Sequence, residues 1–135
     1  MKNFLVCFVA LTLVPALALA GGGSKANGTI NVKNGGSLVM GVIVDPPASL
    51  NPSTATQAQF TAAGGKFVNA GATGNFTNLK AGNHTVVVFQ VPPVMTEAIA
   101  VPALVISSKA YNLGQAQTLN VVVTFNVDGT ANFNP

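Results

Sequence analysis

The stretch that decides the fold is residues 119–127, LNVVVTFNV. Every second residue from Leu119 to Val127 is apolar, and Asn120, Val122, Thr124 and Asn126 lie between them. This period of two is typical of a β-strand with one buried face. Asp128-Gly129 follows as a turn, so residues 130–134 are expected to fold back as a hairpin partner.

A second clear strand is residues 84–91, HTVVVFQV, which is rich in β-branched residues. It lies between Gly82-Asn83 and Pro92-Pro93, so residues that turn the chain or cannot continue a ladder fix its ends. Residues 98–106 form a further apolar run. Pro102 lacks the N–H that a central strand donates, so we expect an edge strand or two short pieces there.

The first half of the chain reads in the same way. Residues 29–33 alternate and precede the turn Asn34-Gly35-Gly36. Residues 38–44 are apolar on both faces, which predicts a central strand, with Gly41 marking a bulge or a close backbone approach.

The region between these strands and the second half gives weaker signals. Residues 45–57 are expected to be loop, with one short helical turn possible at Asn51-Pro52. Weak strands are expected at residues 59–61 and 66–69, around Gly64-Gly65.

Together these segments predict an all-β fold, an antiparallel β-sandwich of seven to eight strands, immunoglobulin-like or prealbumin-like. No segment after the N-terminal region carries apolar residues at helical spacing over two turns. The aromatic side chains available to fill the core are Phe60, Phe67, Phe76, Phe89, Phe125 and Phe133.

The N-terminus has the pattern of an export signal. Lys2 precedes the apolar residues 4–17, and Ala18-Leu19-Ala20 is a cleavage pattern. We therefore expect a signal peptide at 1–20, a flexible leader at 21–27 and the sandwich domain at 28–135. The apolar run is too short for a membrane span, and none is expected after cleavage. The mature protein would be secreted or periplasmic and would contain no cysteine, because Cys7 leaves with the signal.

The composition excludes several classes of function. Charged residues are 7% of the chain, with three acids, no Arg, and lysines scattered singly, so nucleic-acid binding is not expected. His84 is the only histidine, which leaves no metal cluster and no nucleophile pair. Its expected role is a strand residue with a satisfied ring nitrogen. We expect no catalytic residue, no cofactor and no metal.

Residues 71–88, GATGNFTNLKAGNHTVVV, resemble the repeating phrase of carboxypeptidase regulatory-like and prealbumin-like (transthyretin-like) domains. Residues 114–123 resemble the closing strand of the same domains. The resemblance implies a structural motif in which the leucine closes one end of the sandwich and the last glycine allows the chain reversal. The matching positions are Gly74, Phe76, Asn78, Leu79 and Gly82.

The sequence departs from that family at two points. His84 stands where the family usually has Tyr, and no Glu lies near Val88. A crosslink of Lys33 to Asn120 or Asn126 is therefore not expected.

Polar positions are mainly Asn, Thr, Gln and Ser, so the edge strands lack the charges that normally block edge-to-edge pairing. Either those edges are covered or they associate.

Three functions remain open. The first is a secreted, non-enzymatic structural or interaction module at the cell envelope, whose partner is a protein or envelope component, possibly a second copy. The second is a surface subunit that polymerises when residues 28–33 complete a neighbour's sheet. The third is a carbohydrate-binding module, which the chain supports least, because it has no Trp and only Tyr111 as a tyrosine.

Overall fold

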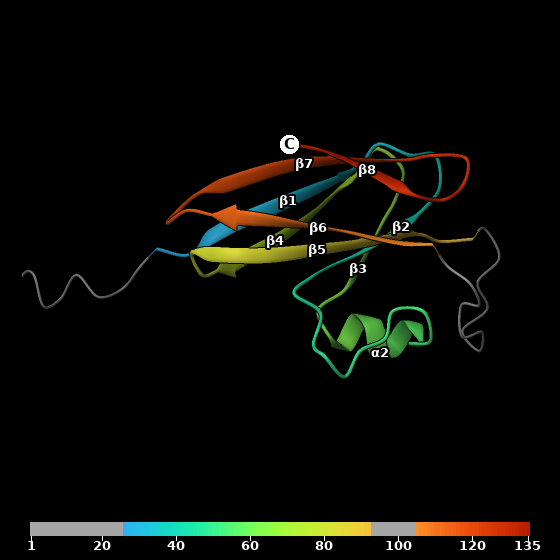
Figure 1. Ribbon diagram of the computed structural model, residues 1–135, viewed down its shortest axis with the longest axis horizontal. Helices are drawn as coiled ribbons and strands as arrows, with labels where there is room; N and C mark the ends of the chain where they lie inside the picture. Colours follow the sequence, from blue (N-terminus) through green and yellow to red (C-terminus); the bar gives the residue numbers. More distant parts are fainter. Residues whose placement is uncertain (1–25, 93–104) are drawn as a thin grey trace, which may run out of the picture.

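The computed structural model describes residues 26–92 and 105–135. The expected signal peptide, most of the expected leader and most of the apolar run 98–106 lie outside the described residues. The described chain forms two β-sheets with one short helix below them (Figure 1). None of the helices in this part of the chain is long and apolar enough to cross a membrane.

Eight strands and one helix make up the described chain. Their order is β1 (Gly28–Asn34), β2 (Met40–Val44), α2 (Gln57–Ala62), β3 (Lys66–Val68), β4 (Thr73–Leu79), β5 (Gly82–Gln90), β6 (Ile106–Leu113), β7 (Thr118–Phe125) and β8 (Ala131–Asn134). The all-β prediction is thus confirmed at the level of class, and the strongest expected strands correspond to β5 and β7.

The strands form two four-stranded sheets. Sheet A has the order β4-β1-β7-β8 and sheet B the order β3-β2-β5-β6. The prediction of purely antiparallel pairing is wrong at one place, because β1 pairs with β7 in parallel, from Thr29 opposite Thr118 to Asn34 opposite Val123. The two strands are far apart in the chain, so no tight hairpin forces them to run in opposite directions.

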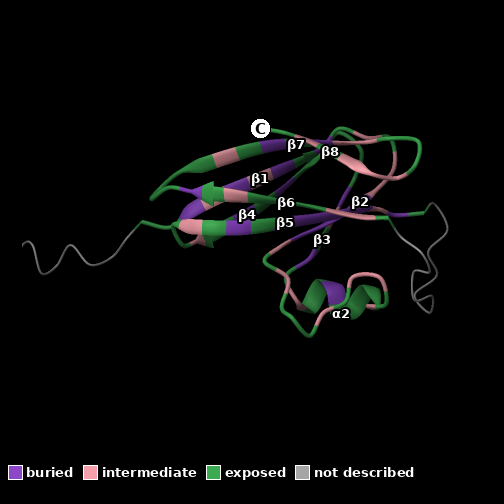
Figure 2. Ribbon diagram, viewed as in Figure 1, coloured by how far each residue is buried: buried purple, intermediate pink, exposed green. Residues whose placement is uncertain are grey.

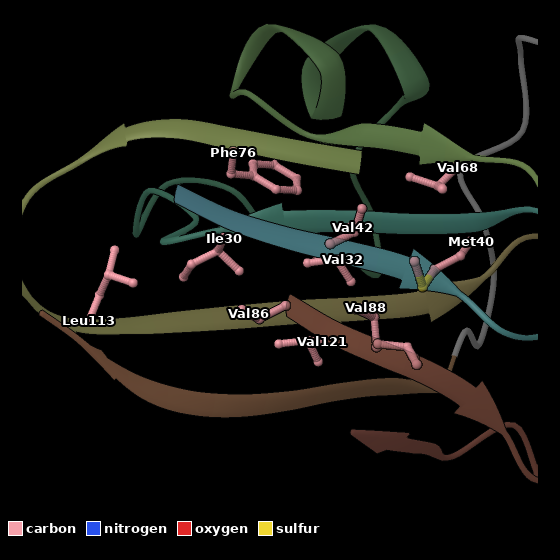
Figure 3. Close-up of a cluster of buried hydrophobic side chains, with 11 residues drawn as sticks. Ile30, Val32, Met40, Val42, Val68, Phe76, Val86, Val88, Leu113 and Val121 are labelled. Carbon is pink, nitrogen blue, oxygen red and sulfur yellow. The ribbon is translucent and has the colours of Figure 1, made fainter. Parts of the chain in front are cut away.

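The main core lies between the two sheets (Figure 3). Ile30 and Val32 of β1 and Val121 of β7 supply it from sheet A, whereas Val86 and Val88 of β5 supply it from sheet B. All five are almost completely inaccessible to solvent. The alternation that predicts the strands therefore places the apolar half of each strand in one shared core.

A second, smaller cluster lies on the outer face of sheet B, where α2 covers it (Figure 2). Phe60 of α2 packs against Phe67 and Phe89, with ring centroids 5.2 and 5.1 Å away. The close approach expected at Gly41 is confirmed, because a Cβ there would stand 2.2 Å from Cζ of Phe89. The glycine leaves the space that the Phe89 ring fills.

The expected weak strand at residues 59–61 is wrong, since these residues belong to α2. Phe60 is the only buried residue of this six-residue helix, so it has no apolar period to detect. The signal was a capping box, in which Gln59 N–H donates to the Thr56 hydroxyl and Thr56 N–H donates to the Gln59 side chain. The neighbouring expected strand does form, as β3.

The sequence also failed to reveal β6 as one strand. Ile106, the last residue of the apolar run 98–106, is its first residue, and the remainder of the strand is mostly polar. The hairpin expected after residue 127 is confirmed, because β8 pairs with β7 from Val122 opposite Asn134 to Phe125 opposite Ala131.

Candidate functional site

Asp45 and His84 form the only ion pair among the described residues. Asp45 ends β2 with a φ of 51°, and His84 is near the start of β5. His84 Nδ1 lies 2.5 Å from Asp45 Oδ2, and His84 Nε2 lies 2.6 Å from the Lys80 carbonyl oxygen. The other carboxylate oxygen, Oδ1, accepts the Thr85 N–H at 2.8 Å. The pair therefore joins the end of β2 to the β4–β5 turn.

Both partners of the His84 ring are hydrogen-bond acceptors. The ring satisfies both only as an imidazolium, with a proton on each nitrogen. The hydrogen bond to Asp45 is the main cause that raises the His84 pKa above 6.5, and the bond to Lys80 adds to it. Neither nitrogen keeps a free lone pair for proton transfer or metal ligation. The expectation of a strand histidine with a satisfied ring is confirmed, and the pair acts as a structural clamp.

The residues that resemble the repeating phrase lie along β4 and at the start of β5. Gly74 and Phe76 lie on β4 with Phe76 in the main core, and a Cβ on Gly74 would stand 2.9 Å from Val68. Asn78 has a φ of 61° and Gly82 a φ of 139°. Leu79 is half-buried and packs against the main core. These residues thus contribute packing along β4 and chain reversal between β4 and β5, and none of them carries a reactive group.

The outer face of sheet A is a polar surface that extends over all four strands of the sheet. The register aligns Asn75, Asn31 and Asn120 across β4, β1 and β7, and Asn31 Nδ2 donates to Asn120 Oδ1 at 2.9 Å. We call this surface the amide–hydroxyl face. Its residues are Thr29, Asn31, Lys33, Thr73, Asn75, Thr77, Thr118, Asn120, Val122, Thr124, Asn132 and Asn134.

The edges of sheet A are not left bare. Lys66 of β3 donates to the carbonyl of Asn75 on the open side of β4, and its ammonium lies 5.1 Å from the Phe76 ring centroid. On β8, the Ala131 N–H donates to the Ser107 hydroxyl at 2.9 Å, and Lys109 Nζ donates to the Phe133 carbonyl at 3.4 Å. The expectation that the edge strands lack blocking charges is therefore wrong for sheet A. Two lysines from sheet B block its edges.

The residues considered for a crosslink are placed apart from any buried reactive site. Lys33 is exposed on the amide–hydroxyl face, where Val122 is its partner across the strands. The Asn120 amide is bonded to Asn31, and Asn126 Nδ2 donates to Thr130 Oγ1 at 2.9 Å in the β7–β8 turn. Among the described residues, the Lys33 side chain makes no hydrogen bond to either asparagine.

Other candidate sites are weak. No three His, Cys, Asp or Glu residues in the described ranges gather as metal ligands. A surface hollow of about 480 Å³ lies between α2 and the preceding loop. No ionisable side chain lines it, and its residues include Pro47, Leu50, Asn51, Thr54 and Gln59. It offers shape and hydrogen-bonding groups but no group with a perturbed pKa.

Sequence reasoning missed one buried polar residue, Asn34, which is completely inaccessible to solvent. Its Nδ2 donates to the carbonyls of Leu38 at 2.7 Å and Val68 at 2.8 Å, and its Oδ1 accepts the Gly36 N–H at 2.9 Å. It therefore links the end of β1 to the segment just before β2 and to the end of β3. The sequence signal was the Asn-Gly-Gly turn, which was interpreted only as a chain reversal.

Tyr111 is a second feature that the sequence did not reveal. Its hydroxyl is buried and makes no hydrogen bond within the described residues. Burial raises the pKa of that hydroxyl above 10.0. Lys109 Nζ lies 5.6 Å from the ring centroid. Tyr111 is therefore not a flat platform offered to solvent, as a sugar-stacking residue would be.

Comparison with known proteins gives no relative for this arrangement. No family model, no curated protein and no solved structure matches the chain.

Proposed function

We propose that this chain is a secreted or periplasmic, non-enzymatic module that serves a structural or interaction role at the cell envelope. Within the all-β class, we propose an immunoglobulin-like or prealbumin-like sandwich related to carboxypeptidase regulatory-like domains. Two four-stranded sheets around one core and the β4–β5 motif support this assignment. The pattern of an export signal supports the location.

The amide–hydroxyl face is the observation that carries the proposal. Lys33 is its only charged residue, and its other members are asparagines, threonines and one valine. A rigid strand framework holds these groups about 4.8 Å apart across the sheet. Such a surface offers many hydrogen bonds in fixed positions, and it contains no Asp, Glu or His that could activate its hydroxyls as a general base. It is suited to contact and not to bond-making.

The two alternative functions receive less support. Strand donation by residues 28–33 would require β1 to leave its place between β4 and β7 of its own chain, with Ile30 and Val32 completely buried there. A carbohydrate-binding module would use exposed aromatic rings, and the Tyr111 hydroxyl is enclosed.

A sedimentation assay tests the proposal. The secreted chain is incubated with envelope fragments from its own host, and the bound fraction is measured after centrifugation. The variant Asn75→Ala/Asn120→Ala removes two exposed amides from the face. The control Asn69→Ala/Asn83→Ala removes two exposed amides from other surfaces. We expect the wild type and the control to sediment with the fragments and the face variant to remain largely in solution.

Two results would overturn the proposal. One is a failed binding test: either the face variant is retained as well as the control, or the wild type is not retained at all. The other is a reproducible hydrolytic activity that His84→Ala abolishes, because a group with both ring nitrogens engaged is not expected to catalyse a reaction.

A further inference from the structure

The four edges of the two sheets are protected to different degrees. The β4 and β8 edges of sheet A are blocked by side chains of Lys66, Ser107 and Lys109. The β3 edge of sheet B is only three residues long, so Phe67 alone directs its backbone groups outward. The β6 edge runs for eight residues. It is the longest edge strand in the described chain, and its outer side has no such protection there.

The register shows which backbone groups of β6 are unpaired. Asp45 N–H donates to the Thr85 carbonyl, so the backbone N–H and C=O groups of Thr85, and of every second residue of β5 counted from it, point toward β2. The backbone groups of His84, Val86 and Val88 therefore point toward β6. These residues are opposite Tyr111, Lys109 and Ser107. The N–H and C=O groups of the intervening β6 residues then point away from the sheet. These residues are Ser108, Ala110 and Asn112, and within the described residues nothing binds their backbone groups.

The side chains of the three residues whose backbone groups point outward from β6 leave room for another strand at this edge. Ser108, Ala110 and Asn112 are small, exposed and uncharged. Pro is absent from the strand, and its one charged residue, Lys109, directs its ammonium toward β8 and Tyr111. Among the residues that the structure describes, the devices by which proteins usually prevent strand addition are therefore missing from this edge alone.

We propose that β6 is a homodimer interface, in which β6 of a second copy pairs antiparallel with it about a two-fold axis at Ala110. Ala110 then lies opposite Ala110 of the second copy, and Ser108 lies opposite Asn112 in both directions. All outward N–H and C=O groups of the three residues are paired across the axis. The two copies of sheet B become one continuous eight-stranded sheet.

The side chains select this register over its neighbours. With the axis at Ala110, Lys109 is opposite the uncharged Tyr111 of the second copy, so no two like charges face each other. An axis at Lys109 would place two lysines directly opposite each other, which is destabilising. An axis at Ser108 or at Asn112 would leave one end of the eight-residue strand without a partner. Only the central register pairs all three residues without a like-charge contact.

The size of this interface determines how it behaves. One pair of edge strands lies at the small end of specific interfaces, below about 1,200 Å². We therefore expect a reversible dimer that dissociates on dilution. The dimer is closed, because each chain uses its single unprotected long edge, so the proposal predicts no fibre. It is independent of the amide–hydroxyl face, which lies on the other sheet.

Analytical ultracentrifugation of the secreted chain, from micromolar to millimolar concentration, tests the proposal. We expect the weight-average mass to rise from one chain to two. Ala110→Lys places two ammonium groups at the axis and should hold the protein monomeric. Thr77→Lys, the matched change on the blocked β4 edge, should leave the association unchanged. A wild type that stays monomeric throughout, or a dimer insensitive to Ala110→Lys or lost in Thr77→Lys, overturns the proposal.

Cysteine crosslinking reads the register and does not depend on how Ala110→Lys folds. Backbone Cα atoms of directly opposite residues are about 5.5 Å apart in a hydrogen-bonded pair, within the range of a disulfide. Ala110→Cys should form a disulfide-linked dimer on mild oxidation, whereas Thr77→Cys should not. Ser108→Cys mixed with Asn112→Cys should crosslink more than either variant alone. Equal crosslinking of Ala110→Cys and Thr77→Cys would contradict the register.

Discussion

Replacement of Asn34 by Ala tests the account of how the β1–β2 connection is held. The change removes two donors to backbone carbonyls, Leu38 O and Val68 O, and one acceptor for the Gly36 N–H. A buried group left without its partner costs about 1–3 kcal/mol. Water reaches the partly buried Leu38 and Gly36 groups, so these are assigned the lower value of about 1 kcal/mol each, and the enclosed Val68 carbonyl about 2 kcal/mol. The expected loss is about 4 kcal/mol.

That loss is large beside the stability of a small domain, about 5–15 kcal/mol. It corresponds to a fall in Tm of roughly 15–25 °C for a domain near this size. The assay is urea and thermal unfolding followed by far-UV circular dichroism, because the chain has no Trp to report by fluorescence. Asn31→Ala is the control. It removes the same side chain from the same strand on the outer face, where the bond to Asn120 is exposed.

The isosteric variant Asn34→Asp separates hydrogen bonding from the loss of volume. Its carboxylate still accepts the Gly36 N–H, but it presents an oxygen where Nδ2 faces the carbonyls of Leu38 and Val68. We expect Asn34→Asp to lose at least as much stability as Asn34→Ala at neutral pH and to regain part of it on acidification. A loss under about 1 kcal/mol in both variants, or an equal loss in Asn31→Ala, would refute the reasoning.

Three further predictions concern the clamp, the second core and the blocked edge. The pKa of His84 is raised in the folded state, so the clamp stabilises the fold below pH 6.5, and this contribution is lost as the pH rises through the folded-state pKa. The urea midpoint of the wild type should therefore fall from pH 6 to pH 9, and that of His84→Gln should fall less steeply. Equal slopes of midpoint against pH in the two proteins would contradict the clamp. Gly41→Ala should destabilise by about 1–3 kcal/mol in chemical unfolding, because its Cβ meets the Phe89 ring, and Phe89→Leu in the same chain should recover part of the loss. Lys66→Ser should speed thioflavin-T-positive aggregation by uncovering the β4 edge, whereas Lys33→Ser, with the same change in charge, should not.

The class of the fold could be predicted because burial is periodic in the strongest strands. In β7, Val121 and Val123 are buried, and Asn120 and Val122 are exposed, as the alternation requires. The predicted strand at 84–91 likewise coincides with most of β5, which is buried along most of its length. Local patterns were sufficient wherever a strand has one polar face or two apolar ones.

The parts that the sequence did not predict depend on contacts between distant residues. β6 is an edge strand with few buried residues, so it carries no apolar alternation. The parallel pairing of β1 with β7 and the blocking of the β4 edge by Lys66 are set by the arrangement of the sheets. The Asp45–His84 clamp joins residues 39 positions apart. No single window of sequence contains these pairs, so composition and periodicity cannot reveal them.

The position of β1 also has a consequence for the order in which the chain folds. Its two neighbours in sheet A are β4 and β7, and β7 ends only ten residues before the C-terminus, at Phe125 of 135 residues. Asn31 of β1 and Asn120 of β7 are opposite each other although 89 positions separate them, so the hydrogen bonds of β1 are complete only after β7 has left the ribosome. Such non-local pairing slows folding. We expect sheet A to remain incomplete in the nascent polypeptide until β7 has been synthesised.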